Sequence, residues 1–248
     1  MTAWHLWGGA GLEWAMATVA AAYTVRGAIG FASNLVVVTL LARSWALDRL
    51  VPVVFLLDFA GSLLLGAYDV RRVRWDELLG LAFGIGMGLG ASWAAWVVAP
   101  GWRPLGGLGA VTVAYAVWGL AVRPERLPHW PRWTGLPLGV AAGFLGGWYG
   151  TGVLPIAAYF QLRHLDPGGF RATFQGVGLV FSGLGIAGYA AAGRLGWPTV
   201  AAALVLLPAV AGGLWLGHRM HRWLSRRGFA QAVLAVLGGL GLSLWWAH

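Results

Sequence analysis

Two glycine-marked breaks, 120 residues apart, interrupt otherwise apolar sequence. The first reads Arg26-Gly27-Ala28-Ile29-Gly30-Phe31-Ala32-Ser33-Asn34, and the second reads Gly146-Gly147-Trp148-Tyr149-Gly150-Thr151-Gly152-Val153-Leu154-Pro155. Backbone that leaves a helix inside a bilayer needs polar partners, so such breaks are tolerated where they are buried in protein or line a cavity. Paired breaks at matching places in two halves of a chain indicate the substrate site of a transporter.

The composition indicates a membrane protein. Hydrophobic residues make up 59% of the 248 residues and charged residues only 10%, and the mean hydropathy is +0.71. Two apolar segments, Leu12–Ala42 and Leu136–Phe160, contain the breaks and are longer than one crossing requires. Six others are close to the roughly 20 residues that a spanning helix needs: Leu50–Tyr68, Leu78–Ala99, Pro104–Ala121, Phe170–Ala192, Trp197–Leu216 and Gly228–Trp246. We therefore expect an all-α polytopic membrane protein with eight hydrophobic segments.

A proline-rich linker divides the chain into two halves. Residues 123–134 contain three prolines, which exclude a continuous helix. Residues 1–122 and residues 135–248 each hold one long broken segment followed by three ordinary segments. At an offset of 120, four positions carry the same residue in both halves: Gly27 and Gly147, Gly30 and Gly150, Ser62 and Ser182, and Arg74 and Arg194. We interpret the halves as two four-segment transmembrane repeats that arose by duplication.

The distribution of the arginines predicts whether each broken segment crosses the membrane or returns to the side that it entered. Arginine alone carries the positive charge of this chain, whose net charge is +9. If each broken segment crosses the membrane once, the two faces carry nine and seven arginines, which gives no orientation signal. If each is a re-entrant hairpin, the counts become four and twelve, a strong positive-inside bias. The hairpin model makes the halves inverted repeats, with both termini outside and the linker in the cytoplasm.

Catalysis and metal binding have little support in the sequence. There is no cysteine, and all six histidines lie at termini or in segments that we read as loops. No buried Ser–His pair is available for an intramembrane enzyme, so we expect no enzyme, no metal site and no cofactor. His218 and His221 have helical i, i+3 spacing, but four arginines between residues 217 and 227 would repel a cation. The basic loops follow from membrane orientation, so no nucleic-acid partner is expected.

The breaks predict an anion-binding site. Half-helices that start near Ser33–Asn34 and Thr151–Gly152 would direct free N–H groups and positive dipole ends at a shared central point. The residues expected to bind substrate are Gly27, Gly30, Ser33 and Asn34 in the first half, Gly147, Gly150, Thr151 and Gly152 in the second, with Arg26 and Gln175 as additional ligands. The alternative for the glycines is that they only permit close helix crossings.

Two charged residues lie within apolar segments. Arg26 directly precedes the first break and would balance a bound anion, whereas Gly146 holds the equivalent position in the second half. Asp58 lies well inside an ordinary span, where a carboxylate is costly and usually functional, so it is our candidate for proton coupling. A structural ion pair between Asp58 and Arg26 is the alternative, and the sequence leaves both open.

The motifs of the second half resemble those of a known family, the TauE/SafE-type sulfite exporters, also called the toluene sulfonate uptake permease family. The glycine-rich segment Gly146–Pro155 is similar to the family's glycine-rich segment ending near proline. Phe170-Arg171-Ala172-Thr173 resembles its Phe-Arg-Ala-Thr element, and Pro208–Arg219 resembles its glycine-rich helix with a basic end. The resemblance implies a bacterial inner-membrane permease for small sulfur-containing or organic anions, such as sulfite, sulfonates or sulfoacetate.

Secondary transport of a small anion by alternating access is the function that we expect, in a multi-pass protein of the inner membrane that contacts lipid. A passive anion channel is one alternative, and it would show flux without saturation. A non-transporting membrane scaffold is another, and it would tolerate Gly150→Val. Homodimers are common among transporters, but nothing in this sequence indicates one.

Overall fold

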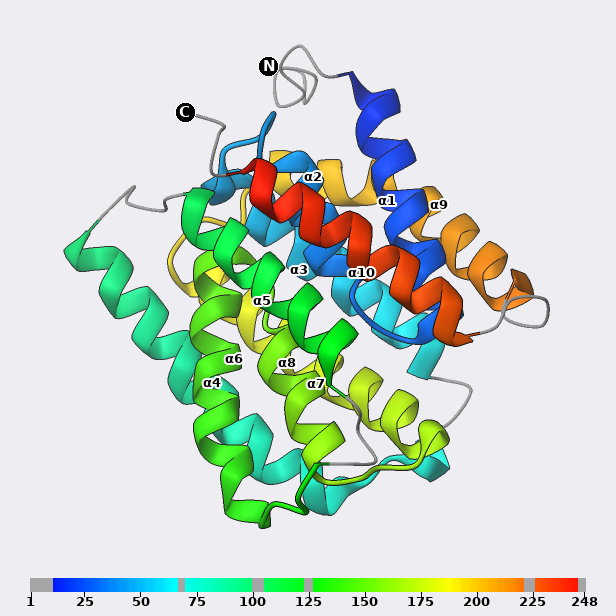
Figure 1. Cartoon of the computed structure of the whole chain (residues 1–248). Coiled ribbons are helices and arrows are strands. Elements are labelled where there is room, and N and C mark those ends of the chain that lie inside the picture. Colours follow the sequence, from blue (N-terminus) through cyan, green and yellow to red (C-terminus); the bar gives the residue numbers. More distant parts are fainter. Residues whose placement is uncertain (1–10, 67–69, 100–104, 123–126, 221–225, 245–248) are drawn as a thin grey trace.

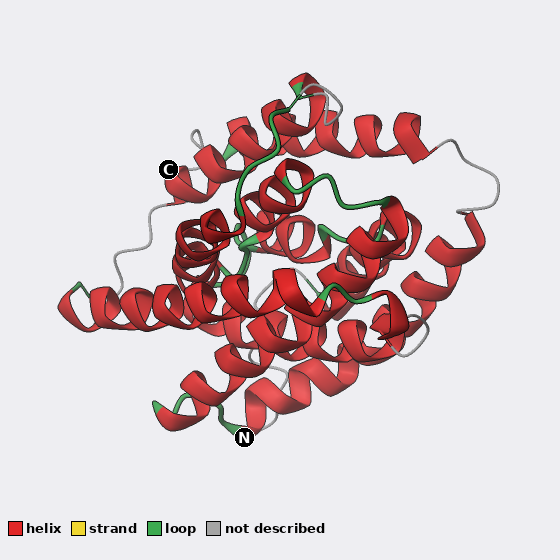
Figure 2. Ribbon diagram, turned by 90° about the horizontal axis from the view of Figure 1, so that it is seen from below, coloured by secondary structure: helices red, strands yellow, loops and turns green. Residues whose placement is uncertain are grey.

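The computed structural model describes residues 11–66, 70–99, 105–122, 127–220 and 226–244. Its regular elements are helices, joined by loops (Figures 1 and 2). The first half contains α1 (Leu12–Ile29), α2 (Ser33–Leu41), α3 (Leu47–Gly66), α4 (Trp75–Val98) and α5 (Leu105–Ala121). The second half contains α6 (Gly135–Tyr149), α7 (Val153–Leu162), α8 (Pro167–Ala191), α9 (Trp197–Met220) and α10 (Arg226–Ser243). Two short 3₁₀ turns, η2 (Val70–Arg72) and η4 (Arg132–Thr134), complete the described elements.

These helices confirm the predicted fold class of an all-α polytopic membrane protein. In the described part of the chain, α3, α4, α8 and α9 are long and apolar enough to cross a membrane. One boundary differs from the sequence reading, because α9 runs to Met220 and includes part of the segment that we read as a basic loop. The extreme termini, including His5, His248 and the expected outside location of both ends, lie outside the described residues.

Both predicted breaks are present, and each separates a long helix from a short one. Helix α1 ends at Gly30, with φ of 97°, and α6 ends at Gly150, with φ of 79°. Glycine adopts this left-handed conformation without steric cost, which explains why both helices stop there. In the first break Ala32 is also left-handed, with φ of 75°, directly before α2 begins.

After each break the chain turns back and forms a hairpin. Helices α1 and α2 form the first hairpin, α6 and α7 form the second, and the break is the tip of each. In the second hairpin, the backbone N–H of Trp130, before α6, donates to the carbonyl of Leu162, at the end of α7, over 3.1 Å. The two ends of this hairpin therefore lie side by side. In the first hairpin, α2 packs back against α1, and Figure 1 shows the same turn between them. The hairpins fit the re-entrant model, whereas their orientation in a membrane stays a prediction.

The two halves pack onto each other by a reciprocal pattern. Helix α1 of the first hairpin packs on α9 of the other half, and α6 of the second hairpin packs on α4 of the first half. Helix α3 likewise packs on α8, and α5 on α10. Exchanging the halves leaves these pairings unchanged, as expected for interlocked repeats. The duplication, the inverted orientation and the boundaries at residues 122 and 135 remain predictions.

Glycines bring the backbones of the crossing helices into contact. A Cβ on Gly27 of α1 would lie 2.6 Å from the carbonyl oxygen of Leu214 in α9. A Cβ on Gly139 of α6 would lie 2.5 Å from the carbonyl oxygen of Leu81 in α4. Close backbone approach is a common way for helices to associate in membranes, where lipid provides no hydrophobic drive between them. The crossings hold each hairpin against a long helix of the opposite half.

Candidate functional site

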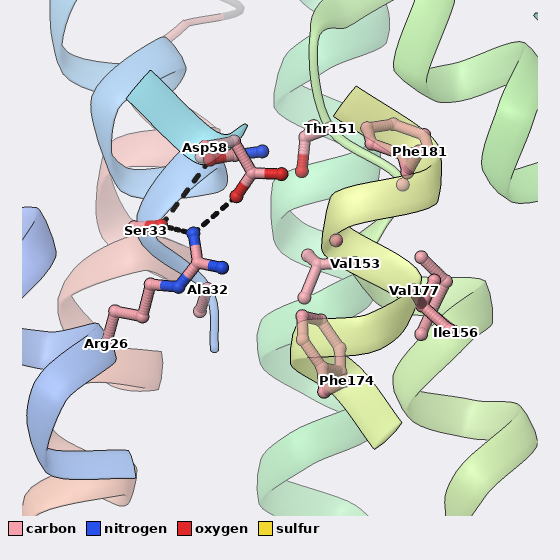
Figure 3. A pocket seen from close by; sticks show the side chains of 13 residues that line it. Arg26, Ala32, Ser33, Asp58, Thr151, Val153, Ile156, Phe174, Val177 and Phe181 are labelled. Carbon is pink, nitrogen blue, oxygen red and sulfur yellow. Dashed lines mark hydrogen bonds and ion pairs between the residues drawn. The ribbon is translucent and has the colours of Figure 1, made fainter. Parts of the chain in front are cut away.

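A small buried cavity lies where the two hairpin tips meet (Figure 3). It is bounded by the first hairpin, α3, the second hairpin and α8, and its volume is about 30 Å³. Since a cavity needs roughly 10–15 Å³ to hold a water molecule, this one holds about two. The residues that line it are Arg26, Ala32, Ser33, Asn34, Asp58, Thr151, Gly152, Val153, Ile156, Phe174, Val177, Gly178 and Phe181.

Two helix N-termini, each with a partial positive charge, lie at this cavity. Helix α2 begins at Ser33 and α7 begins at Val153, and both residues line the cavity. Neither helix has a side-chain hydrogen bond at its N-cap. The first N–H groups of a helix lack intrahelical partners, so both termini offer donors and a partial positive charge. The arrangement favours a negatively charged ligand between the tips.

Arg26 brings a full positive charge to the same place. Its side chain is 1% exposed, and its guanidinium contacts three other helices. Nη1 donates to Oδ1 of Asp58 and, over 3.2 Å, to Oγ of Ser33. Nη2 donates to Oγ of Ser62 over 2.6 Å and to Oε1 of Gln175 over 2.7 Å. Buried charges are stabilised by such pairing, and the guanidinium is held in one plane by partners on both sides.

Gln175 connects this network to the tip of the first hairpin. Its side-chain nitrogen donates to the carbonyl of Gly30 over 2.7 Å, while its oxygen accepts from Arg26. It belongs to α8, so the second half of the chain fixes the break of the first half. Gln175 does not itself line the cavity, which makes it a positioning residue for Arg26 in this structure.

Thr151 faces the ion pair from the other hairpin. Its side chain points towards Asp58 in Figure 3. Its hydroxyl is buried and has no hydrogen-bond partner among the described residues. An unpaired buried hydroxyl costs about 1–3 kcal/mol. A polar group of this kind, directed into a cavity, is expected where a ligand completes the site.

A model of the sulfite exporter TauE/SafE family matches residues 15–244. The chain belongs to this family. The "Probable inner membrane transporter protein TsaS" of Comamonas testosteroni is 30% identical to it over 200 residues, which cover 77% of this chain and 80% of that protein. No solved structure matches the chain. The resemblance seen in the motifs is therefore confirmed, and this TauE/SafE family member is a multi-pass transporter of the inner membrane.

The structure brings together six of the residues that the sequence singled out in this TauE/SafE family member. Arg26, Ser33, Asn34, Thr151 and Gly152 all line the cavity, and so does Asp58. The ion pair between Arg26 and Asp58, one of the two alternatives for Asp58, is present. Substrate binding by these residues stays a prediction.

The other four predicted glycines do not line the cavity. Gly27 packs on the backbone of α9, and Gly147 lies against Ser92 of α4. Gly30 and Gly150 form the left-handed turns, where Gly30 lies against the side chain of Arg171 and Gly150 against Val38 and Val51. Close packing at helix crossings, the alternative reading, explains Gly27 and Gly147, and turn geometry explains Gly30 and Gly150. A role of these four glycines in substrate binding stays a prediction.

An apolar wall of the cavity was not foreseen from the sequence. It consists of Phe174, Val177 and Phe181 on α8, together with Val153 and Ile156 on α7. The sequence does contain a pattern that places the α8 residues of this wall together, because positions 174, 177, 178 and 181 have the i, i+3, i+4, i+7 spacing of one helix face. In an apolar span this pattern cannot be told from lipid contact until the neighbouring helices are known.

A second polar cluster ties the open end of the second hairpin to α4. Glu77 is buried and accepts from Arg163 over 2.8 Å and from the hydroxyl of Tyr159 over 2.5 Å. The hydrogen bond to Glu77 raises the pKa of Arg163 above its ordinary value. Arg163 also donates to the carbonyl of Trp130 over 2.6 Å. This cluster anchors the hairpin at the end remote from its tip.

Proposed function

We propose that this protein is a secondary transporter of small sulfur-containing or organic anions, which bind between the hairpin tips and move by alternating access. One observation carries the proposal: two uncapped helix N-termini, Arg26 and the unpartnered hydroxyl of Thr151 surround a single buried cavity. The family description and the relative's name support transport as the activity.

The chemistry of the cavity favours an anion over a cation. A guanidinium, the N–H groups of two helix starts and hydroxyls are hydrogen-bond donors to a negatively charged oxygen. Asp58 is the one carboxylate among the described residues that line the cavity, and it is already paired with Arg26. A cation would meet the positive ends of both half-helices.

Burial of the site favours a carrier over a channel. Arg26, Ser33, Asp58 and Thr151 are all at least 95% buried, and the cavity holds about two water molecules. An anion of four or more heavy atoms is larger than two water molecules, so we expect the surrounding elements to move when it binds. Movement of elements around a central site is the basis of alternating access. A scaffold without transport would leave unexplained why the unpaired hydroxyl of Thr151 lies in a cavity between two helix N-termini.

Binding of anions to the purified protein tests the proposal. The detergent-purified chain is heated with sulfite, sulfate, thiosulfate, sulfoacetate, taurine or small carboxylates, because a ligand of the folded state raises the melting temperature. We expect stabilisation by at least one of these anions in wild type and a weaker or absent effect in Thr151→Val. Saturable uptake of the same anion into liposomes would separate a carrier from a channel.

Thr18→Val is the matched control for Thr151→Val. Thr18 of α1 also has a buried hydroxyl without a partner in the described structure, but it does not line the cavity. Both substitutions remove an unpaired hydroxyl, so we expect both to stabilise the ligand-free protein. Only Thr151→Val should weaken anion binding. Equal binding by wild type and Thr151→Val would contradict the proposed site.

A further inference from the structure

The guanidinium of Arg26 has almost no free capacity for a ligand in this structure. It carries five N–H donors, of which Nη1 and Nη2 supply four to protein oxygens. Nε is buried and has no partner among the described residues. An incoming anion thus finds one free donor, whereas arginine recognises carboxylates and similar anions best through two parallel hydrogen bonds. One existing partner must leave before the anion binds well.

Asp58 is the partner whose position an anion would take. Its carboxylate is itself an anion bound to Nη1, and it lines the cavity opposite Thr151 (Figure 3). Ser62 and Gln175 hold Nη2 from outside the cavity, and Gln175 is also tied to the carbonyl of Gly30. These two neutral partners keep the guanidinium in place if Asp58 turns away.

Charge balance then determines what must accompany the anion. Arg26 and Asp58 together are neutral, so a bound monoanion in this buried site would be balanced only by the partial positive charges of the two helix N-termini and by no full positive charge. An isolated buried charge is strongly unfavourable. A proton on Asp58 removes this charge and also removes the competitor for Arg26. We propose that the substrate anion and the Asp58 carboxylate are alternative partners of Arg26, so that each monoanion binds together with one proton, which Asp58 holds.

This inference rests on the proposed function, because it takes the cavity as the anion site. Among the residues that the structure describes, two titratable groups face Asp58, both from α1: Arg26, and Tyr23, whose ring lies 5.8 Å from the Arg26 guanidinium carbon. Helix α2 has no titratable side chain. On the other helices packed against α3, the titratable residues are occupied elsewhere: Arg171 lies over Gly30, Tyr189 contacts Phe55, Tyr149 reaches Gly107, and His218 and Arg219 lie in the last turn of α9. Asp58 is thus the proton acceptor that the cavity offers.

Proton uptake on anion binding tests the inference. Methanesulfonate is a suitable probe because it stays ionised across the accessible pH range. Calorimetric titration of the full chain in two buffers with different protonation enthalpies gives the number of protons taken up per anion. We expect about one proton per anion, and a Kd that rises roughly tenfold per pH unit wherever Asp58 is ionised before binding. The sign follows because the anion-bound state holds one proton more than the free state.

Asp58→Asn should uncouple the anion from the proton. In this variant Arg26 has no carboxylate partner, so we expect methanesulfonate to bind without proton uptake, with a Kd that does not depend on pH and is at least as low as that of wild type at acid pH. Asp48→Asn, at an exposed position in the first turn of the same helix, should behave like wild type. If Asp58→Asn fails to fold, the proton count of wild type decides alone.

The outcomes separate this inference from the proposed function. Methanesulfonate binding to wild type without proton uptake overturns the coupling and leaves the anion site standing. Failure of methanesulfonate to bind either protein also overturns the coupling, and the proposed function survives only if another anion stabilises wild type but not Thr151→Val. If no anion of the panel binds, both ideas fail together.

Discussion

Arg26 shows how much one residue can depend on partners that are distant in the chain. Its guanidinium bonds to Ser33 seven residues away, to Asp58 and Ser62 on α3, and to Gln175 on α8, which is 149 positions away. The sequence identified Arg26 and Asp58 because charged residues are rare in apolar segments. It could not select Gln175 as the link between the halves, because an amide on a helix face has many acceptable partners.

Ala32 leads to a prediction about the stability of the first break. Its left-handed backbone, with φ of 75°, costs a residue with a Cβ roughly 1–2 kcal/mol, and glycine avoids this cost. Glycine loses more conformational entropy on folding, so we expect Ala32→Gly to stabilise the protein by up to about 1 kcal/mol. The measurement is the melting temperature in detergent.

Ala42→Gly is the comparison for Ala32→Gly, because Ala42 follows the same short helix with ordinary right-handed geometry, at φ of −61°. This substitution removes a Cβ without relieving strain, so we expect a lower melting temperature than wild type. A similar decrease in both variants would show that the left-handed conformation at position 32 stores no strain.

Helices α4 and α6 illustrate what the numerous glycines do for whole elements. A Cβ on Gly143 of α6 would collide with the carbonyl of Ile85 and lie 2.8 Å from the backbone nitrogen of Leu89. Backbone atoms cannot move aside as a flexible side chain can, so the helices would have to separate. We expect Gly143→Ala to destabilise the protein by about 1–3 kcal/mol, the usual range for overpacking, measured as the change in unfolding free energy or melting temperature.

Gly90 on α4 provides the opposite case. A Cβ there would meet no atom within 4 Å, so the crossing is unaffected. Alanine is a better helix former than glycine, and we expect Gly90→Ala to stabilise the protein by about 0.5–1 kcal/mol. A melting temperature of Gly143→Ala as high as that of Gly90→Ala would contradict the close backbone contact between α4 and α6.

The path of the whole chain through the membrane leads to a labelling prediction. The hairpin model places the start of α1 and the end of α2 on the same face, whereas a single crossing would place them on opposite faces. Because the chain has no native cysteine, Gly11→Cys and Ser44→Cys each introduce one reactive site. We expect an impermeant thiol reagent to label both from outside the cell, and to label Pro128→Cys, in the linker, only from the cytoplasm. Labelling of Gly11→Cys and Ser44→Cys from opposite faces would exclude the first hairpin.

The sequence by itself determined the class of protein, the positions of both breaks and the family. It also determined the distribution of arginines that favours re-entrant hairpins. These properties are local or additive: hydropathy sums over a segment, a glycine turn needs only its own residues, and arginines are counted loop by loop. The ion pair of Arg26 with Asp58 was one of two readings that the sequence left open, and Thr151 was proposed as a ligand without any view of its surroundings.

Only the tertiary structure decided which of these residues meet. In the folded chain, Gly27 and Gly147 lie at helix crossings, whereas Ser33, Asp58 and Thr151 lie around one cavity. Apolar side chains of α7 and α8 form one wall of that cavity. The physical reason is that each hairpin packs against a long helix of the other half, so the surroundings of every site residue come from distant sequence. The unpaired hydroxyl of Thr151 exists only as a consequence of that packing, because no pattern within the chain shows which donors remain without acceptors.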